Sequence, residues 1–389
     1  MDFSFTDEQR AIQKSVREFV ERNFRKELVE EYELKDAEST SWPWKLFEKM
    51  VEELGVQAAP IPEAYGGLGL DTVTSTLIME ELSRGWTAFA LSAFAVPCSL
   101  YAFPIYTFGT INQAERFVLP LVKGEILGGF ALTEPNAGSW AANQQTRAER
   151  YSNDEYRLNG TKTFITNCGL AQYYVVFART DFVPGKLHQG ISCFVVDGCR
   201  AGVASLPIKK WGQKASPFGE LVLTDCFVSK ENLIGKEGEG YKIAMATLDN
   251  GRVFIAAQAL GIAQAAYEEA LGYANQRIVF GEKLSSLQLT QEKIADMRVK
   301  LEASRLLTYK AAWLKDQGLP FSEEASIAKL YASECACQIA DSAIQLHGGY
   351  GYTKEFAAMR LWIEARALPL YEGTSEVQRL KIARKNICE

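Results

Sequence analysis

The hydrophobic periodicity of this chain changes twice along its length, and that change is the strongest constraint on its fold. Apolar residues first recur at the three- and four-residue spacing of helices, then alternate as in strands, and then return to helical spacing. We therefore predict an α+β multidomain protein of 389 residues. Its parts are an N-terminal all-α domain at 1–122, a middle β domain at 123–238 and a C-terminal helical domain at 239–389.

The N-terminal region contains a helix start and a long apolar segment. Thr6 and Gln9 have the spacing of a capping box, and one helix face follows them: Ile12, Val16, Phe19 and Val20. The segment 86–108 has no acidic or basic residue and is interrupted by Pro97 and Pro104. We predict a buried pair of core helices there, which could also wall an apolar ligand pocket.

The middle region alternates as strands do. Asn159-Gly160 lies between two alternating runs, 156–158 and 161–165, which predicts a hairpin with a tight turn. Further strands are predicted at 173–178, 191–196 and 220–227.

Long helices are predicted after Gly240. The second of them stops near Gly318, with Pro320 just beyond, and Ser322 starts the third. Their apolar stripes are Ile255, Ala259, Ile262, Ala266 and Ala270; Ile294, Met297 and Leu301; and Ala328, Ala332, Cys335, Ile339, Ala343 and Leu346. Long helices with short connections predict an antiparallel bundle.

Composition excludes several classes of function. The net charge of -6 comes with no cluster of Lys and Arg that would hold nucleic acid. Eight scattered cysteines without CxxC spacing, with only two histidines, argue against a metal site and fit a reducing compartment. The first residues, Met1 to Glu8, do not have the pattern of a signal peptide, and no run of about 18 apolar residues predicts a membrane span. We expect a cytoplasmic protein.

Four patches combine small residues with groups that bind ligands or carry protons. They are 131–139 (ALTEPNAGS), 164–167 (FITN), 345–352 (QLHGGYGY) and 371–376 (YEGTSE). Three glycines after a helix exceed what a helix end needs and favour close approach to a ligand. In the last patch, Glu372 stands between Tyr371 and Gly373, an arrangement that suits a partly desolvated base with a raised pKa. Rossmann and P-loop motifs are absent.

Taken in order, these patches resemble the acyl-CoA dehydrogenase family over essentially the whole chain. Further matching pieces are 5–9 (FTDEQ), 62–69 (PEAYGGLG), 158–162 (LNGTK), 248–252 (LDNGR) and Gln378-Arg379. The resemblance implies a helical domain, a β-barrel and a four-helix bundle. It also implies FAD as cofactor, an electron-transferring flavoprotein as partner, a homotetramer and a bacterial cytoplasmic location.

The resemblance also assigns residues. The implied FAD-binding positions are Leu132, Thr133, Ser139, Phe164, Thr166, Arg277, Phe280, Gln288, Gln345, Gly348, Gly349, Thr374 and Glu376. The implied acyl-CoA positions are Ser139, Asp249, Arg252, Tyr371 and Gly373. Some FAD contacts are implied to cross a subunit interface.

The resemblance implies a base that removes the α-proton of the thioester while a β-hydride passes to the flavin. The family has two places for this base, Glu372 in the last patch and position 251. Because this chain has Gly251, Glu372 is the expected base.

The sequence constrains the identity of the acyl chain less than it constrains the type of reaction. Relatives that act on glutaryl-CoA place an arginine where this chain has Leu91, so we expect a short or medium, branched, cyclic or aryl-substituted chain without a terminal charge, unless Arg84 supplies a cation. Two alternatives stay open: an enoyl-CoA reductase running the reverse reaction, and a dehydrogenase for dicarboxylic (glutaryl- or benzylsuccinyl-type) thioesters. Trp140, where the family usually has aspartate, could reshape the ligand entrance or pack under a loop.

Overall fold

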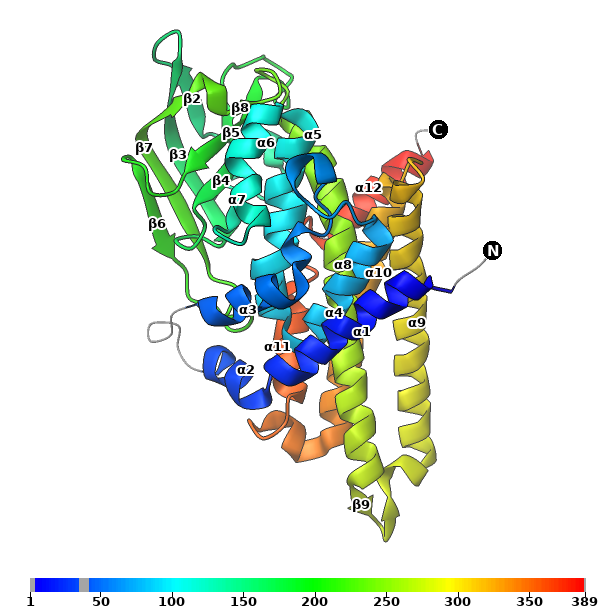
Figure 1. The fold of residues 1–389 in the computed structure, drawn as a ribbon. Helices are drawn as coiled ribbons and strands as arrows, with labels where there is room; N and C mark the ends of the chain where they lie inside the picture. Colours follow the sequence, from blue (N-terminus) through cyan, green and yellow to red (C-terminus); the bar gives the residue numbers. More distant parts are fainter. Residues whose placement is uncertain (1–3, 35–41, 388–389) are drawn as a thin grey trace.

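A computed structural model describes residues 4–34 and 42–387 of the chain. Met1 to Phe3 and Cys388, which entered the sequence analysis, lie outside the described residues. The order is helices, then sheet, then helices (Figure 1), which confirms the predicted fold class.

The N-terminal helices surround one long helical segment. The capping box at Thr6 forms as predicted, with its hydroxyl accepting from the Gln9 backbone N–H at 3.1 Å. The helices are α1 (Asp7–Asn23), α2 (Lys26–Glu33), α3 (Trp44–Leu54), α4 (Thr72–Ala90), a π-helical segment (Leu91–Ala102), α5 (Phe103–Phe108), α6 (Ile111–Phe117) and α7 (Leu119–Val122).

The prediction of two helices broken at Pro97 and Pro104 is wrong. The segment Thr72–Phe108 breaks instead at Trp86, where the backbone is non-helical, and then runs on as a helix that is π-helical over Leu91–Ala102. By length and composition it could cross a membrane, but 94% of its most apolar window is buried inside the protein, as in a core helix. The π-helical turns accommodate Pro97, and Pro104 stands in the first turn of α5, so neither proline ends the helix.

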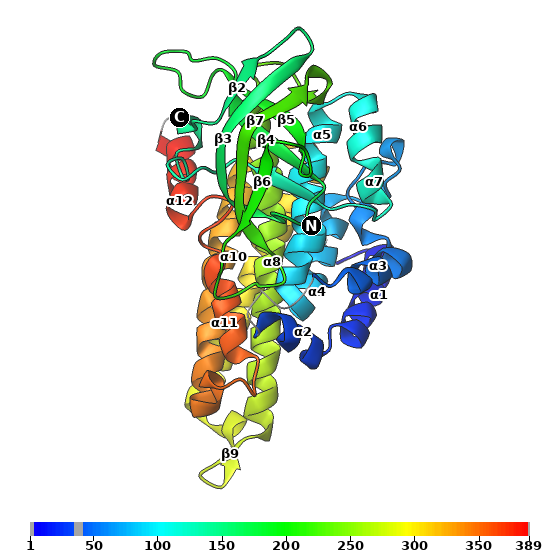
Figure 2. The same cartoon turned by 90° about the vertical axis from the view of Figure 1, so that its left-hand side faces the viewer.

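The middle region is one eight-stranded sheet. The hydrogen-bonded path runs β6-β7-β3-β2-β4-β5-β8, and β1 pairs in parallel with β4. The strands are β1 (Gly128–Ala131), β2 (Arg147–Arg150), β3 (Glu155–Thr166), β4 (Tyr173–Arg179), β5 (Ile191–Asp197), β6 (Val203–Pro207), β7 (Phe218–Ser229) and β8 (Leu233–Ile234). Figure 2 shows α5, α6 and α7 beside this sheet, where they share an apolar core with β4 and β5.

The predicted hairpin at Asn159-Gly160 is also wrong. These residues lie inside the single strand β3, where the register with β7 shifts between Leu158 and Gly160. A Cβ at Gly160 would lie 2.7 Å from the Thr146 Cα, so the glycine allows close backbone approach rather than a turn. An isolated glycine in an alternating run often marks such an irregularity.

The C-terminal helices form the predicted bundle. Helices α8 (Gly240–Gln276), α9 (Gln288–Asp316) and α10 (Ser322–His347) run side by side (Figures 1 and 2). The small hairpin β9 (Ile278–Val279) and β10 (Glu282–Lys283) connects α8 to α9. Helices α11 (Ala358–Ala367) and α12 (Ser375–Ile387) complete the region. The predicted stripes face its core, with only Ile294 partly exposed.

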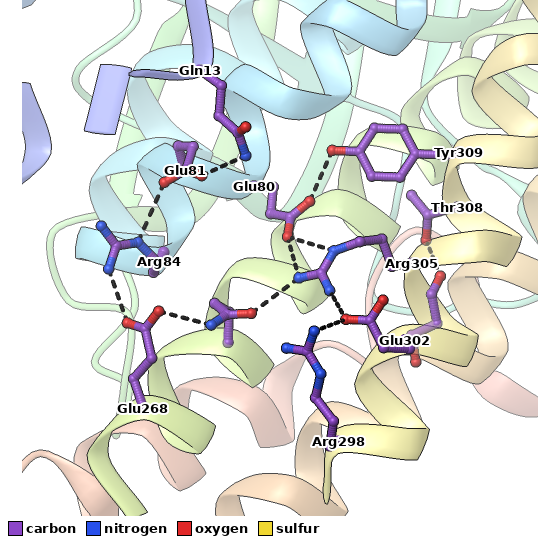
Figure 3. A network of polar contacts seen from close by, with 12 residues as sticks. Gln13, Glu80, Glu81, Arg84, Glu268, Arg298, Glu302, Arg305, Thr308 and Tyr309 are labelled. Carbon is purple, nitrogen blue, oxygen red and sulfur yellow. Dashed lines mark hydrogen bonds and ion pairs between the residues drawn. The ribbon is translucent and has the colours of Figure 1, made fainter. Parts of the chain in front are cut away.

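A charged network fastens α4 to the bundle (Figure 3). Glu80, 5% exposed, accepts from Arg305 Nη2 at 2.7 Å and from the Tyr309 hydroxyl at 2.8 Å. Its neighbour Glu81 accepts from Arg17 of α1 and from Arg84, so the middle of α4 is tied to α1 and α9 by charge. A buried carboxylate needs such partners, because an unpaired charge away from water is costly.

We predict that Arg305→Leu destabilises the protein by about 3 kcal/mol, because it leaves Glu80 buried with only the tyrosine hydroxyl as donor. Arg298→Leu is the matched control, since Arg298 pairs with Glu302 at 3.0 Å but is half exposed, and we expect a change within about 0.5 kcal/mol. The free energy of unfolding from denaturant titration measures both. Equal effects of the two variants would contradict a special role for the Glu80 pair.

Candidate active site

Glu372 lies in a loop where its backbone adopts a conformation that is unfavourable for glutamate. Between α11 and α12 the chain passes through Glu372 at φ 56° and Gly373 at φ 87°, both left-handed. A non-glycine residue in this region costs free energy and persists only where its surroundings hold it. Such residues cluster at functional sites.

Three side chains hold this loop through its backbone carbonyls. Gln378 Nε2 donates to the carbonyl oxygens of Glu372 at 3.0 Å and Gly373 at 2.9 Å. Lys329 Nζ, fully buried on α10, donates to the same Gly373 oxygen at 2.7 Å. Arg252 Nε approaches the Glu372 carbonyl at 3.4 Å. These donors stabilise the left-handed turn against its strain.

The environment of the Glu372 carboxyl group favours proton exchange near neutral pH. Its Oε2 atom is buried and has no hydrogen-bond partner among the described residues. Burial raises the pKa of Glu372 to about 7, while the positive charges of Arg252 and Lys329 oppose the rise. A carboxyl group that titrates near neutral pH is matched to general base catalysis.

Gly251 provides the space in which this carboxyl group lies. A Cβ added at Gly251 would stand 3.0 Å from Glu372 Oε2, 3.2 Å from Oε1 and 2.7 Å from Leu100 Cδ2. The two positions that the resemblance implies for a base therefore lie close together in space, and the Glu372 carboxyl group lies in the space beside Gly251.

Tyr371 and the pair Asp249 and Arg252 surround the loop. The Tyr371 hydroxyl donates to Gln258 Oε1 at 2.9 Å. Arg252, 4% exposed, forms an ion pair with Asp249. Asp249 also pairs with Lys381 of α12. The structure thus brings the implied acyl-CoA residues of α8 beside Glu372, and their contacts to a thioester remain predictions.

The first patch follows β1 and is fixed by a buried ion pair. Lys162 Nζ of β3 donates to Glu134 Oε1 at 2.8 Å and to the Leu132 carbonyl at 3.1 Å. Burial raises the pKa of Glu134, but Lys162 and the Gln145 backbone N–H more than offset it and the pKa is lowered. Thr133 is half-buried beside this pair.

Ser139, at the end of this patch, and its neighbour Trp140 face solvent. Ser139 is exposed, and Trp140 is 61% exposed, so the indole does not pack under a loop. Trp140 therefore lies at the surface beside the first patch, where it could shape the approach of a ligand.

Phe164 and Thr166 stand at the end of β3. Phe164 adopts a left-handed φ of 58° and is 61% exposed, with its ring stacked on Phe218 at 5.8 Å. An exposed aromatic ring in a strained conformation is unusual unless a ligand or partner covers it. The half-buried Thr166 lies two residues along the same strand.

The glycine patch lies at the far end of α10. A hollow of about 510 Å³ is lined there by Tyr273, Arg277, Val279, Leu284, Gln345, Leu346, His347, Gly348, Gly349, Tyr350 and Thr353. His347 is buried, not a surface residue, and its Nε2 atom has no hydrogen-bond partner among the described residues. Added Cβ atoms at Gly348 and Gly349 would meet nothing within 4 Å, so their backbone is open to a ligand.

The implied cofactor residues therefore form two groups in one chain. Leu132, Thr133, Phe164, Thr166, Thr374 and Glu376 belong to the sheet and the Glu372 loop, whereas Arg277, Phe280, Gln288, Gln345, Gly348 and Gly349 lie at the other end of the bundle. Lys329, at the Glu372 loop, and His347, at the hollow, are separated by about 27 Å along α10, at about 1.5 Å per residue. Phe280, 95% exposed at φ 52°, projects from the tip beside the hollow.

Sequence reasoning missed the residues that support the base. Lys329 could have been found, because it interrupts the buried alanine face of α10 formed by Ala325, Ala328 and Ala332. A lysine on a buried helix face needs a partner. Gln378 and Gln258 carry no such signal, since polar residues on helices are common.

Comparison with known proteins gives one consistent result. Residues 6–125, 129–226 and 238–387 match the models of the acyl-CoA dehydrogenase N-terminal, middle and C-terminal domains. The chain belongs to the acyl-CoA dehydrogenase family. It is therefore an oxidoreductase, as the sequence analysis predicted.

Full-length relatives and solved structures agree. The "Acyl-CoA dehydrogenase, short-chain specific" of Clostridium acetobutylicum is 43% identical over 99% of both chains. The structure of butyryl-CoA dehydrogenase from Megasphaera elsdenii has a TM-score of 0.94 and 41% identity, covering 100% of both chains. A chain in the structure of the "Electron transferring flavoprotein of Acidaminococcus fermentans" has a TM-score of 0.95 and 42% identity, again covering 100% of both chains.

Proposed function

We propose that this enzyme oxidises a short, uncharged acyl-CoA thioester to the trans-2-enoyl-CoA, with Glu372 as base, FAD as cofactor and an electron-transferring flavoprotein as electron acceptor. The observation that carries the proposal is the Glu372 carboxyl group. Its Oε2 atom is buried and has no hydrogen-bond partner in the part of the chain that the structure describes, and the residue is held in a left-handed loop beside Gly251.

The residues of the chain fit FAD. Thr133 and Thr166 offer hydroxyl groups at the ends of β1 and β3, and Phe164 offers an exposed aromatic face beside them. At the other end, Arg277 supplies a cation and Gly348 and Gly349 an open backbone, which suit a phosphate group. When bound, FAD supplies an acceptor for the hydride that leaves the β-carbon.

Glu372 performs the proton transfer. A thioester α-proton is too weakly acidic to leave unaided, so its removal needs a base within reach and a donor for the carbonyl oxygen that gains negative charge. The carboxylate of Glu372 takes the proton, and we expect its backbone N–H to donate to the thioester oxygen. Because the site excludes water from Oε2, the carboxylate is a stronger base there than in solution.

The apolar wall supports an uncharged acyl chain. The π-helical segment Leu91–Ala102 is buried throughout and contains no charged residue. Arg84, the cation that the sequence analysis considered for a distal carboxylate, is engaged with Glu21, Glu81 and Glu268. The names of the short-chain and butyryl-CoA relatives favour a chain of about four carbons over the dicarboxylic alternative.

The two groups of cofactor residues support an oligomer. Because the two groups of residues lie at separate ends of the bundle, one FAD molecule cannot contact both groups of the same chain. We therefore expect a second copy of the chain to complete each FAD site. Exposed apolar side chains on α9 and α12, Leu306, Trp313 and Leu380, offer surface for such packing. The homotetramer and the cytoplasmic location remain predictions.

The test of substrate class is anaerobic titration of the purified holoenzyme with a panel of thioesters while the oxidised flavin band is followed. The panel holds butyryl-, octanoyl-, isobutyryl-, phenylpropionyl- and glutaryl-CoA. We expect butyryl-CoA to bleach the band most completely. Preferential bleaching by glutaryl-CoA would overturn the uncharged chain. A flavoprotein that no member bleaches, but whose reduced form is reoxidised by enoyl-CoA, would instead be a reductase.

We predict that Glu372→Gln lowers kcat by about 10³-fold or more, because the amide cannot accept the α-proton. The variant should still bind FAD and thioester, since glutamine retains the size of the side chain. Stopped-flow flavin reduction with butyryl-CoA measures the effect, and the flavin spectrum is the control for folding. Near-normal reduction in the holo variant would remove Glu372 from its proposed role.

We also predict that Lys329→Met shifts the pH dependence of kcat/KM to higher pH. Lys329 favours the ionised form of Glu372, so its loss raises the pKa of Glu372, and activity at neutral pH falls while activity at high pH recovers. Arg252, Asp249, Lys381 and Tyr371 also face the loop and are unchanged in the variant. Lys310→Met, which removes an exposed lysine of α9, is the control. A uniform loss at every pH would show that Lys329 acts only on the fold.

A further inference from the structure

Two carbonyl groups of the π-helical segment lack their helical partners. In a π-helix the backbone N–H of residue i+5 bonds to the carbonyl of residue i. Pro97 and Pro104 stand five residues after Ser92 and Ser99, and proline has no N–H to donate. The Ser92 and Ser99 carbonyls therefore cannot receive the i+5 hydrogen bond of a π-helix, and a donor from another element can take its place.

Two asparagines supply those donors. Asn167 Nδ2 donates to the Ser92 carbonyl at 3.0 Å, and Asn250 Nδ2 donates to the Ser99 carbonyl at 2.9 Å. Both asparagines are buried, at 0% and 2% exposure, so water cannot replace either bond. Each asparagine comes from a part of the proposed site, since Asn167 follows Thr166 and Asn250 precedes Gly251.

The orientation of the Asn250 amide is fixed from both sides. Lys315 Nζ of α9 donates to Asn250 Oδ1 at 2.6 Å, and an ammonium group can only donate. The Nδ2 atom therefore has to face the Ser99 carbonyl, which can only accept. This chain of polar contacts connects α9, α8 and the π-helical segment through one amide.

The bond lies next to the contact between the apolar wall and the base. Leu100 follows Ser99, and Gly251 follows Asn250. Leu100 Cδ2 is 2.7 Å from the place of a Gly251 Cβ, and the Glu372 carboxylate oxygens are 3.0 and 3.2 Å from the same point. The Asn250 bond therefore fixes how far the wall stands from α8 one residue away from Glu372.

We infer that Asn250 is a positioning residue that sets the acyl-chain preference, because its hydrogen bond to the proline-freed Ser99 carbonyl holds Leu100 against Gly251 beside the base. The inference rests on the proposed function, since it assigns Leu100 to the wall of the acyl site. Without the bond, Leu100 can move away from Glu372, and the site loses its fit for a short chain.

A double-mutant cycle with Pro104 tests this inference. Asn250→Leu removes the donor, whereas Pro104→Ala returns a backbone N–H five residues after Ser99. The single variants, the double variant and the wild-type holoenzyme are compared by kcat/KM for butyryl-CoA and octanoyl-CoA. Flavin content and the absorption spectrum of each protein are recorded first.

For Asn250→Leu we expect about a tenfold loss of kcat/KM for butyryl-CoA and a smaller loss for octanoyl-CoA, so that the ratio of the two falls. Pro104→Ala alone should stay within about threefold of wild type, and adding it to Asn250→Leu should restore most of the ratio. A structural role alone would lower yield or stability without changing the ratio. If Asn250→Leu does not fold, Asn250→Asp takes its place, since it keeps the acceptor for Lys315 and loses the donor.

An unchanged ratio in the Asn250 variants, or a ratio that Pro104→Ala does not restore, would overturn the inference. These outcomes are distinct from failure of the proposed function. If no thioester reduces the wild-type flavin, the proposed function fails. If butyryl-CoA reduces the wild-type enzyme but the variants keep the same chain-length preference, only the role of Asn250 is wrong.

Discussion

The geometry of the candidate active site depends on the desolvation of one carboxyl group, that of Glu372. Burial of the Glu372 Oε2 atom raises the pKa of the carboxyl group to about 7, while the nearby cations Arg252 and Lys329 favour the ionised form. The left-handed loop, the three donors to its carbonyls and the absence of a side chain at Gly251 together hold the carboxyl group in this buried position.

The long helical segment Thr72–Phe108 connects the region of Glu372 to the rest of the molecule. At one end, Glu80 and Glu81 tie it to α1 and α9 by charge, and at the other its π-helical turns meet α8 and the sheet through asparagine side chains. Close packing fixes the apolar side chains of this segment, and the polar contacts at Glu80, Ser92 and Ser99 add directional contacts to three other parts of the fold.

The sequence was sufficient for the architecture, because periodicity gives the order of helices and sheet. Glu372 as the base was implied by the family resemblance, and that assignment stays a prediction. The Asn159-Gly160 pair was misread because the same dipeptide serves a turn or a bulge, and only pairing with β2 and β7 decides between them. The effect of Pro97 was predicted wrongly because proline is found both where a helix breaks and within π-helical turns, so the residue alone does not distinguish them. Lys329 and Gln378 act through contacts between helices distant in sequence, which periodicity does not encode.

The close packing at Gly251 limits how a carboxylate could be relocated by design. A Cβ at this position would lie 3.0 Å from one Glu372 oxygen and 2.7 Å from Leu100 Cδ2, so both side chains would have to shift to admit it. A carboxylate grafted onto α8 at 251 would therefore call for a smaller residue at 372, and the two substitutions would be coupled rather than additive.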